Sequence, residues 1–210
     1  TFAELDFVAK AENIVFIGSE MNYDSFWWKM MFVGAAYVGA AQHWRRADRN
    51  VVAYVDRGYT RLEKLAIEGL AERHGATTVS LTSTQGLLAL LNRERDQYKL
   101  QDVLFFCHGV PGVIELNYDG SPAIRLGLTN VTLVSDKAFS ADGRIFSYAC
   151  RTGVSSWSSS FEAEADARSE DSLAAKLAKW HRIEVHAFLR RTLYRDVLRQ
   201  SSDSEAITKA

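Results

Sequence analysis

Short apolar runs separated by amphipathic segments recur along the first half of the chain. Residues 13–18, 51–55 and 103–107 are rich in β-branched or aromatic residues and indicate buried strands, and residues 77–81 indicate a weaker one. Between them, apolar residues spaced three or four apart predict helices. This alternation, with right-handed crossovers, predicts a mostly parallel central sheet of about six strands with helices on both faces, an α/β three-layer sandwich.

The helices between these strands have recognisable starts. Residues 24–47 predict the longest helix, capped by Asn22 or Asp24 and apolar nearly all round, which suits a helix buried against a sheet. Lys29 interrupts its apolar run, which is too short for a membrane span of about 20 apolar residues. The other two helices are expected to open at capping boxes, Thr60-x-x-Glu63 and Thr82-x-x-Gln85.

The second half of the chain departs from this rhythm. Two apolar runs, 113–116 and 123–126, flank Asn117-Tyr118-Asp119-Gly120 and predict a β-hairpin. A short helix near 135–139 is expected next. The remaining elements are a strand over 144–149, a helix over 172–181 that faces inward through Leu173, Leu177 and Trp180, and a last strand over 183–188.

We expect a single domain over residues 1–210, because no internal repeat or linker divides the chain. Residues 1–12 are expected to be helical or frayed. The serine-rich and acidic stretch 154–171 predicts a mobile loop, and the polar stretch 196–210 a frayed tail.

Composition narrows the class of partner. The net charge is −1 over 210 residues, so nothing points toward nucleic acid or an anionic membrane, and a soluble protein is expected. Two cysteines cannot form a disulfide scaffold. No cofactor or metal is expected, because no phosphate-binding loop, dinucleotide glycine fingerprint or metal-ligand spacing occurs.

The candidate chemistry lies where two predicted strands end. One strand leads into His108-Gly109, and the other leads into Cys150. Ligands of open α/β sheets bind outside the carboxyl ends of the strands, so both side chains are expected to face one crevice. A histidine beside a cysteine can take the thiol proton and create a nucleophile. The amides of Gly109 and Cys150 are the candidate oxyanion hole. Cys107, one residue before the histidine, should point into the core.

These residues resemble the caspase-like cysteine peptidases, which include caspases, metacaspases, gingipains, separase and bacterial CHAT-type domains. The order of apolar strand, His-Gly, hairpin, apolar strand and Ala149-Cys150-Arg151-Thr152-Gly153 carries the resemblance. More narrowly, the runs around His108 and Cys150 look like caspase-like domains of bacterial polymorphic toxins and secreted effectors. The chain departs from caspases in having Cys107 before the histidine and Ser147-Tyr148 before Ala149.

The resemblance implies a cysteine endopeptidase with Cys150 as nucleophile and His108 as base. An endopeptidase would act on a protein or peptide substrate. A toxin or effector domain would be secreted, or delivered into a target-cell cytoplasm, as part of a larger polypeptide, and a cognate immunity or inhibitor protein would then be a further partner. Three loops would supply the substrate pocket, and their candidates are Ser19, Glu20, Arg151, Arg190, Arg191, Thr192 and Tyr194. An inward arginine would favour an acidic substrate residue and an inward Glu20 a basic one, so the preference stays open.

Other functions fit the same residues. One alternative is that Cys150 and His108 are ordinary strand-end residues, since cysteine is often buried and inert. The domain would then be a caspase-like pseudoenzyme that docks a protein partner and does not cut. A thiol acyl-hydrolase or acyltransferase could also use the same dyad on an ester or thioester.

Overall fold

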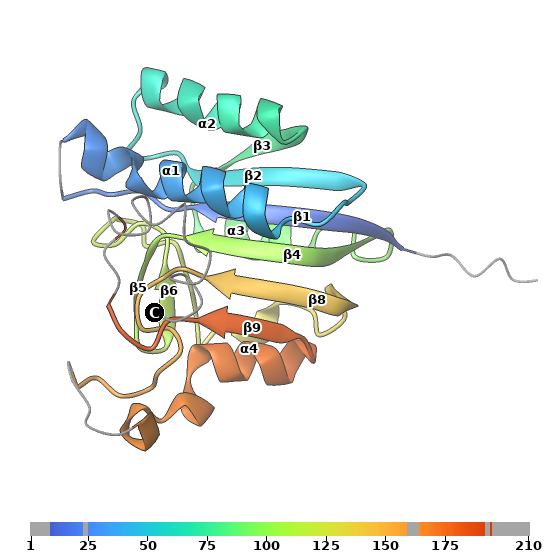
Figure 1. Cartoon of the computed structure of the whole chain (residues 1–210), viewed down its shortest axis with the longest axis vertical. Coiled ribbons are helices and arrows are strands. Elements are labelled where there is room, and N and C mark those ends of the chain that lie inside the picture. The colour runs from blue at the N-terminus through green and yellow to red at the C-terminus, as the bar shows by residue number, and fades with distance from the viewer. Residues whose placement is uncertain (1–8, 23–24, 159–163, 192–193, 195–210) are drawn as a thin grey trace, which may run out of the picture.

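The computed structural model describes residues 9–22, 25–158, 164–191 and 194. Its centre is a six-stranded sheet of order β3-β2-β1-β4-β8-β9 in which every pairing is parallel (Figure 1). The strands are β1 (Lys10–Ile17), β2 (Arg49–Val55), β3 (Ala76–Leu81), β4 (Tyr98–Phe106), β8 (Phe139–Ser147) and β9 (Glu184–Ala187). The direction of winding reverses between β1 and β4, so these two strands flank the topological switch point.

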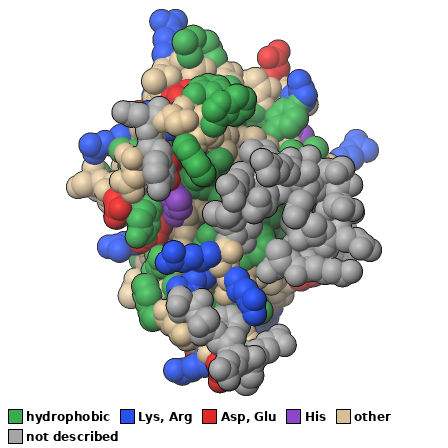
Figure 2. All heavy atoms as spheres, turned by 60° about the vertical axis from the view of Figure 1, so that its left-hand side comes forward, with side chains coloured by type: hydrophobic (Ala, Val, Ile, Leu, Met, Phe, Trp, Pro, Cys, Tyr) green, Lys and Arg blue, Asp and Glu red, His purple; other side chains and the backbone are tan. Residues whose placement is uncertain are grey.

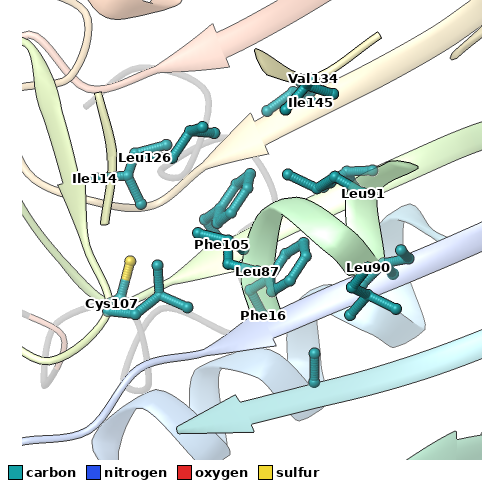
Figure 3. Packing of buried hydrophobic residues seen from close by; sticks show 14 of the residues in the cluster. Phe16, Leu87, Leu90, Leu91, Phe105, Cys107, Ile114, Leu126, Val134 and Ile145 are labelled. Atoms are coloured by element: carbon teal, nitrogen blue, oxygen red, sulfur yellow. The ribbon is translucent and has the colours of Figure 1, made fainter. Parts of the chain in front are cut away.

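Two helices cover each face of the sheet, as the alternating pattern predicts. Helices α1 (Phe26–His43) and α2 (Arg61–Arg73) pack on the residues of one face, including Val15 and Leu104. Helices α3 (Thr84–Asn92) and α4 (Leu173–His181) pack on the other. Figure 3 shows this second core, in which Phe16, Phe105 and Ile145 of the sheet meet leucines of α3.

A small antiparallel sheet stands beside the carboxyl end of β4. It consists of β5 (His108–Val110), β6 (Val113–Glu115) and β7 (Arg125–Gly127), in the order β5-β6-β7. The predicted hairpin is therefore confirmed as β6 and β7. The sequence did not indicate that His108 would begin a third strand, which pairs with β6 through His108 and Glu115.

Two predicted helix boundaries are corrected. The first helix ends at His43, before the predicted residue 47, because the backbone N–H of Arg45 donates to Asp102 at 2.9 Å and draws the chain out of the helix. The third helix is capped by Ser83 instead of Thr82, since the Ser83 hydroxyl accepts the Gly86 N–H. The capping box of Thr60 and Glu63 forms as predicted.

Other predicted elements differ at single positions. A 3-10 turn at Val131–Leu133 and the start of β8 at Phe139, which pairs with Leu100, leave no helix over 135–139. Trp180 is 38% exposed instead of inward, and its indole N–H donates to the Val134 carbonyl at 2.8 Å. Residues 10–12 belong to β1 instead of a helix.

The predicted loop 154–171 contains two 3-10 turns, Glu164–Ala167 and Ser169–Asp171. Residues 1–8, 159–163 and the predicted tail 196–210 lie outside the described part. Within the described part, no helix has the length and apolar character that crossing a bilayer requires.

Candidate functional site

Three neighbouring strands direct the site residues to one edge of the sheet. Glu20 follows β1, His108 follows β4, and Cys150 follows β8. Because β1, β4 and β8 are adjacent and parallel, their carboxyl ends lie together (Figure 1). This is the edge where open α/β sheets bind ligands.

His108 and Cys150 line the same cavity, as the sequence predicts for a common crevice. The cavity has a volume of about 320 Å³ and is lined by Glu20, Asn22, His108, Gly109, Val110, Tyr118, Cys150, Arg151 and Arg191. Figure 2 brings this edge forward and shows a histidine among hydrophobic, acidic and basic side chains.

The His108 ring is held by aromatic and polar contacts. The His108 ring and the ring of Phe32 on α1 form a T-shaped contact, with centroids 5.0 Å apart. The ring centroid of Tyr118, between β6 and β7, lies 5.4 Å from that of His108. Its Nε2 lies 2.7 Å from Oε2 of Glu20, and the side chain remains 29% exposed. The ring is thus fixed in orientation and still open to the cavity.

Glu20 lines the cavity, and its carboxylate is engaged on both oxygens. Its side chain is only 2% exposed, and its second oxygen accepts the backbone N–H of Asn22 at 2.7 Å. A carboxylate that is occupied on both oxygens is poorly placed to select a basic substrate residue. This pairing was not predictable from local sequence, because 88 residues separate Glu20 from His108.

Gly109 brings β5 against the turn that follows β8. A Cβ atom at this position would lie 2.6 Å from the carbonyl oxygen of Cys150 and 2.8 Å from Cβ of Ala149. Only glycine permits this approach, since real Cβ atoms do not come so close to backbone atoms. The backbone at Gly109 and at Cys150 is therefore packed together at the rim of the cavity.

The two cysteines lie in different surroundings. Cys150 is partly buried at the cavity, whereas Cys107 is fully buried in the core, as predicted (Figure 3). Burial raises the pKa of the Cys107 thiol well above its ordinary value. Cys107 is therefore the inert thiol of the pair.

The segment after Cys150 is anchored by Arg151. This residue has a positive φ of 58° and a buried side chain, and its guanidinium donates to the carbonyls of Ser156, at 2.8 Å, and Ser158. The Thr152 hydroxyl lies 2.8 Å from that of Ser147. These contacts fix the turn that carries Cys150.

The remaining predicted substrate residues are divided by burial. Ser19 is fully buried beside Gly58, and Tyr194 is 6% exposed, so neither is among the residues that line the cavity. The Tyr194 hydroxyl accepts the Cys107 N–H and donates to the Tyr148 carbonyl at 2.7 Å, and burial raises its pKa. Arg191 lines the cavity; Arg190 is exposed outside it. Thr192 lies outside the described residues.

The same strand order occurs in dinucleotide-binding proteins, where a glycine-rich turn after the first strand holds the pyrophosphate. The loop after β1 reads Gly18-Ser19-Glu20-Met21-Asn22 and lacks the glycine spacing that lets a pyrophosphate approach. The Glu20 carboxylate would also repel a phosphate. The loop chemistry disfavours a dinucleotide.

No protein-family model, curated protein or solved structure shows a significant match to this chain. Because a fold alone does not determine function, the function must be argued from the residues of the site.

Proposed function

We propose that this chain is a cysteine endopeptidase of the caspase-like kind, with Cys150 as nucleophile and His108 as general base and acid. The observation that carries the proposal is the common cavity, in which a partly buried thiol and a partly exposed imidazole follow neighbouring parallel strands. A thiol needs a nearby base to become a good nucleophile at neutral pH, and His108 is the histidine that lines this cavity.

The reaction follows from this pairing. His108 removes the thiol proton, and the Cys150 sulfur attacks the carbonyl carbon of the scissile peptide bond. The C–N bond then breaks as His108 returns the proton to the leaving amine, which gives an acyl-enzyme. Water, deprotonated by His108, attacks the acyl carbon and releases the thiol and a carboxylic acid.

The developing oxyanion needs hydrogen-bond donors close to the nucleophile. We assign this role to the amides of Gly109 and Cys150, whose backbones pack together at the cavity rim.

The proposal also covers the substrate, the biological role and a protein partner of the chain. We propose a polypeptide substrate, action as a bacterial toxin or effector domain of a longer polypeptide, and a cognate inhibitor protein. A cavity of about 320 Å³ suits the side chains around one scissile bond.

The test compares wild type with Cys150→Ala and His108→Ala after incubation with a proteome, with new peptide termini identified by mass spectrometry. Both variants should lose cleavage, and Cys107→Ala serves as the matched control that should retain it. Cleavage that persists in Cys150→Ala would overturn the proposal. Wild-type hydrolysis of acyl thioesters without peptide cleavage would favour a thiol acyl-hydrolase, and slow iodoacetamide labelling of Cys150 would favour a pseudoenzyme.

A further inference from the structure

The contact between Glu20 and His108 points to a role for Glu20 that builds on the proposed function. We infer that Glu20 is a positioning residue for His108, so that the site works as a triad of Cys150, His108 and Glu20. Glu20 does not touch the substrate in this assignment; it acts through the imidazole.

The backbone around Glu20 is fixed to the strand that carries His108. The Gly18 N–H donates to the Phe106 carbonyl at 2.8 Å, and the Ser19 N–H donates to the Leu116 carbonyl at 2.7 Å. A Cβ at Gly18 would lie 2.5 Å from Cβ of Cys107, so β1 and β4 leave the sheet in close contact. Glu20 is therefore placed against His108 by the backbone and not by a flexible side chain alone.

The carboxylate of Glu20 has two distinct partners. One oxygen accepts the Asn22 N–H at 2.7 Å, and the other lies 2.7 Å from Nε2 of His108. An ionised carboxylate can only accept hydrogen bonds, so it fixes the hydrogen of the neutral ring on Nε2. The lone pair is then on Nδ1, which is the nitrogen left to take a proton from the Cys150 thiol.

The surroundings of the ring support the same function. Phe32 and Tyr118 border the imidazole, and Glu20 sets its rotation about the bond to Cβ. A general base acts well only when its nitrogen is aimed at the proton it removes. Glu20 supplies this aim and stabilises the imidazolium that forms during the reaction.

A purely structural ion pair is the competing explanation. Elsewhere in this chain, the buried carboxylates of Glu12 and Asp102 are paired with arginines, which are always charged. Glu20 is paired instead with a partly exposed histidine inside the cavity that contains Cys150. That choice of partner suits proton transfer better than stability.

The experiment measures two rates in Glu20→Ala and Glu20→Gln. The first is the alkylation of Cys150 by iodoacetamide at pH 7, and the second is the turnover of fluorescently labelled casein. A general base contributes about 10²–10⁴-fold, so a ring that is no longer aimed should lower kcat by at least about 10-fold with little change in KM. Added formate should restore much of the rate of Glu20→Ala, because it can replace the missing carboxylate, and should not restore Glu20→Gln.

Glu115→Ala is the matched control. Glu115 lies across from His108 in the small sheet and lines a neighbouring cavity, so its loss should leave both rates unchanged. A kcat of Glu20→Ala equal to that of wild type would overturn the role of Glu20. The same holds if kcat falls but formate does not restore it, while Glu20→Ala unfolds at the same urea concentration as wild type. The dyad would still stand if Cys150→Ala and His108→Ala abolished cleavage; turnover that survived in Cys150→Ala would remove both proposals.

Discussion

Buried carboxylates have different kinds of partner on the two sides of the central sheet: the amino edge, where the parallel strands begin, and the carboxyl edge, where they end. At the amino edge, Glu12 is fully buried and meets three arginines, with contacts of 3.0 Å to Arg93 and 2.6 Å to Arg95, and a third contact to Arg49. At the carboxyl edge, Glu20 is almost as buried but meets one histidine and one backbone N–H.

Asp102 repeats the amino-edge arrangement, with Arg45 at 3.1 Å and Arg144 at 2.9 Å. Arginine does not lose its proton in proteins, so these pairs are permanent and tie distant segments together. A histidine can gain or lose a proton near neutral pH. In this fold, permanently charged arginine pairs join distant segments at the amino edge. The pair that can gain or lose a proton lies at the carboxyl edge, where the proposed reaction takes place.

The largest effect should come from the amino edge. Glu12→Ala leaves three arginines close together without their carboxylate, and breaking a buried pair in this way typically costs about 3–5 kcal/mol. Urea denaturation should show this loss in the free energy of unfolding, while the folded fraction keeps the wild-type rate of Cys150 alkylation.

Asp142→Ala is the control for that variant. Asp142 contacts Arg45 at the same edge but is 71% exposed, so its loss should cost at most about 1 kcal/mol. A cost for Glu12→Ala as small as this would break the comparison between the two edges.

A second effect concerns His181, which lies at the end of α4 and packs on Phe139. Burial lowers the pKa of His181 from 6.5 to about 4. The unfolded chain therefore binds a proton at a higher pH than the folded chain does, and this histidine removes stability as the pH falls from 6.5 toward 4. The loss should be on the order of 2 kcal/mol between pH 7 and pH 4.5.

Urea titrations at these two pH values provide the measurement. His181→Phe should lose less stability on acidification than wild type by that amount. Equal losses in the two proteins would mean that His181 is not the group responsible.

A third effect concerns the carboxyl edge, where Gly109 packs against the backbone of Cys150. Gly109→Ala forces a Cβ into the carbonyl of Cys150, and overpacking of this kind costs about 1–3 kcal/mol. Casein turnover should fall more steeply than stability, because the proposed oxyanion amides move apart. Gly69→Ala, in the middle of α2 with no atom outside the local helix backbone within 4 Å of the new Cβ, should instead leave turnover unchanged and stabilise slightly.

The smallest effect should come from Arg191, the exposed arginine that lines the cavity. An exposed charge contributes at most about 1 kcal/mol, so Arg191→Glu should lower kcat/KM for peptides with an acidic residue near the scissile bond by up to about 5-fold relative to basic ones. Arg190→Glu changes the neighbouring charge outside the cavity and should have little effect. Equal effects of the two substitutions would show that Arg191 does not select the acidic residue near the scissile bond.

The strands were predictable where burial follows the apolar pattern. Residues 13–17 and 103–106 are buried strands in the structure, as their sequences indicate. The first three residues of β1, before Asn13, could not be assigned in the same way, because Glu12 is buried only through arginines that come from residues 49–95. Local sequence does not carry such long-range pairing.

The site was predictable to a similar extent. The common crevice of His108 and Cys150 follows from strand ends in a parallel sheet, which the sequence does indicate. The contact of Glu20 with His108 and the burial of Tyr194 depend on strand order and side-chain direction, which one sequence does not determine. A polar loop residue such as Glu20 therefore looked like part of the substrate rim.

The hydrogen bonds of Tyr194 also bear on when the site can be complete. Its single hydroxyl joins Cys107, at the end of β4, to Tyr148, at the end of β8, and its ring packs edge-on against Phe32, which borders His108. During synthesis on the ribosome, the strands that carry the histidine and the cysteine emerge well before this tyrosine. The nascent polypeptide therefore lacks the hydrogen bonds of Tyr194 between the ends of β4 and β8 until residue 194 has left the exit tunnel.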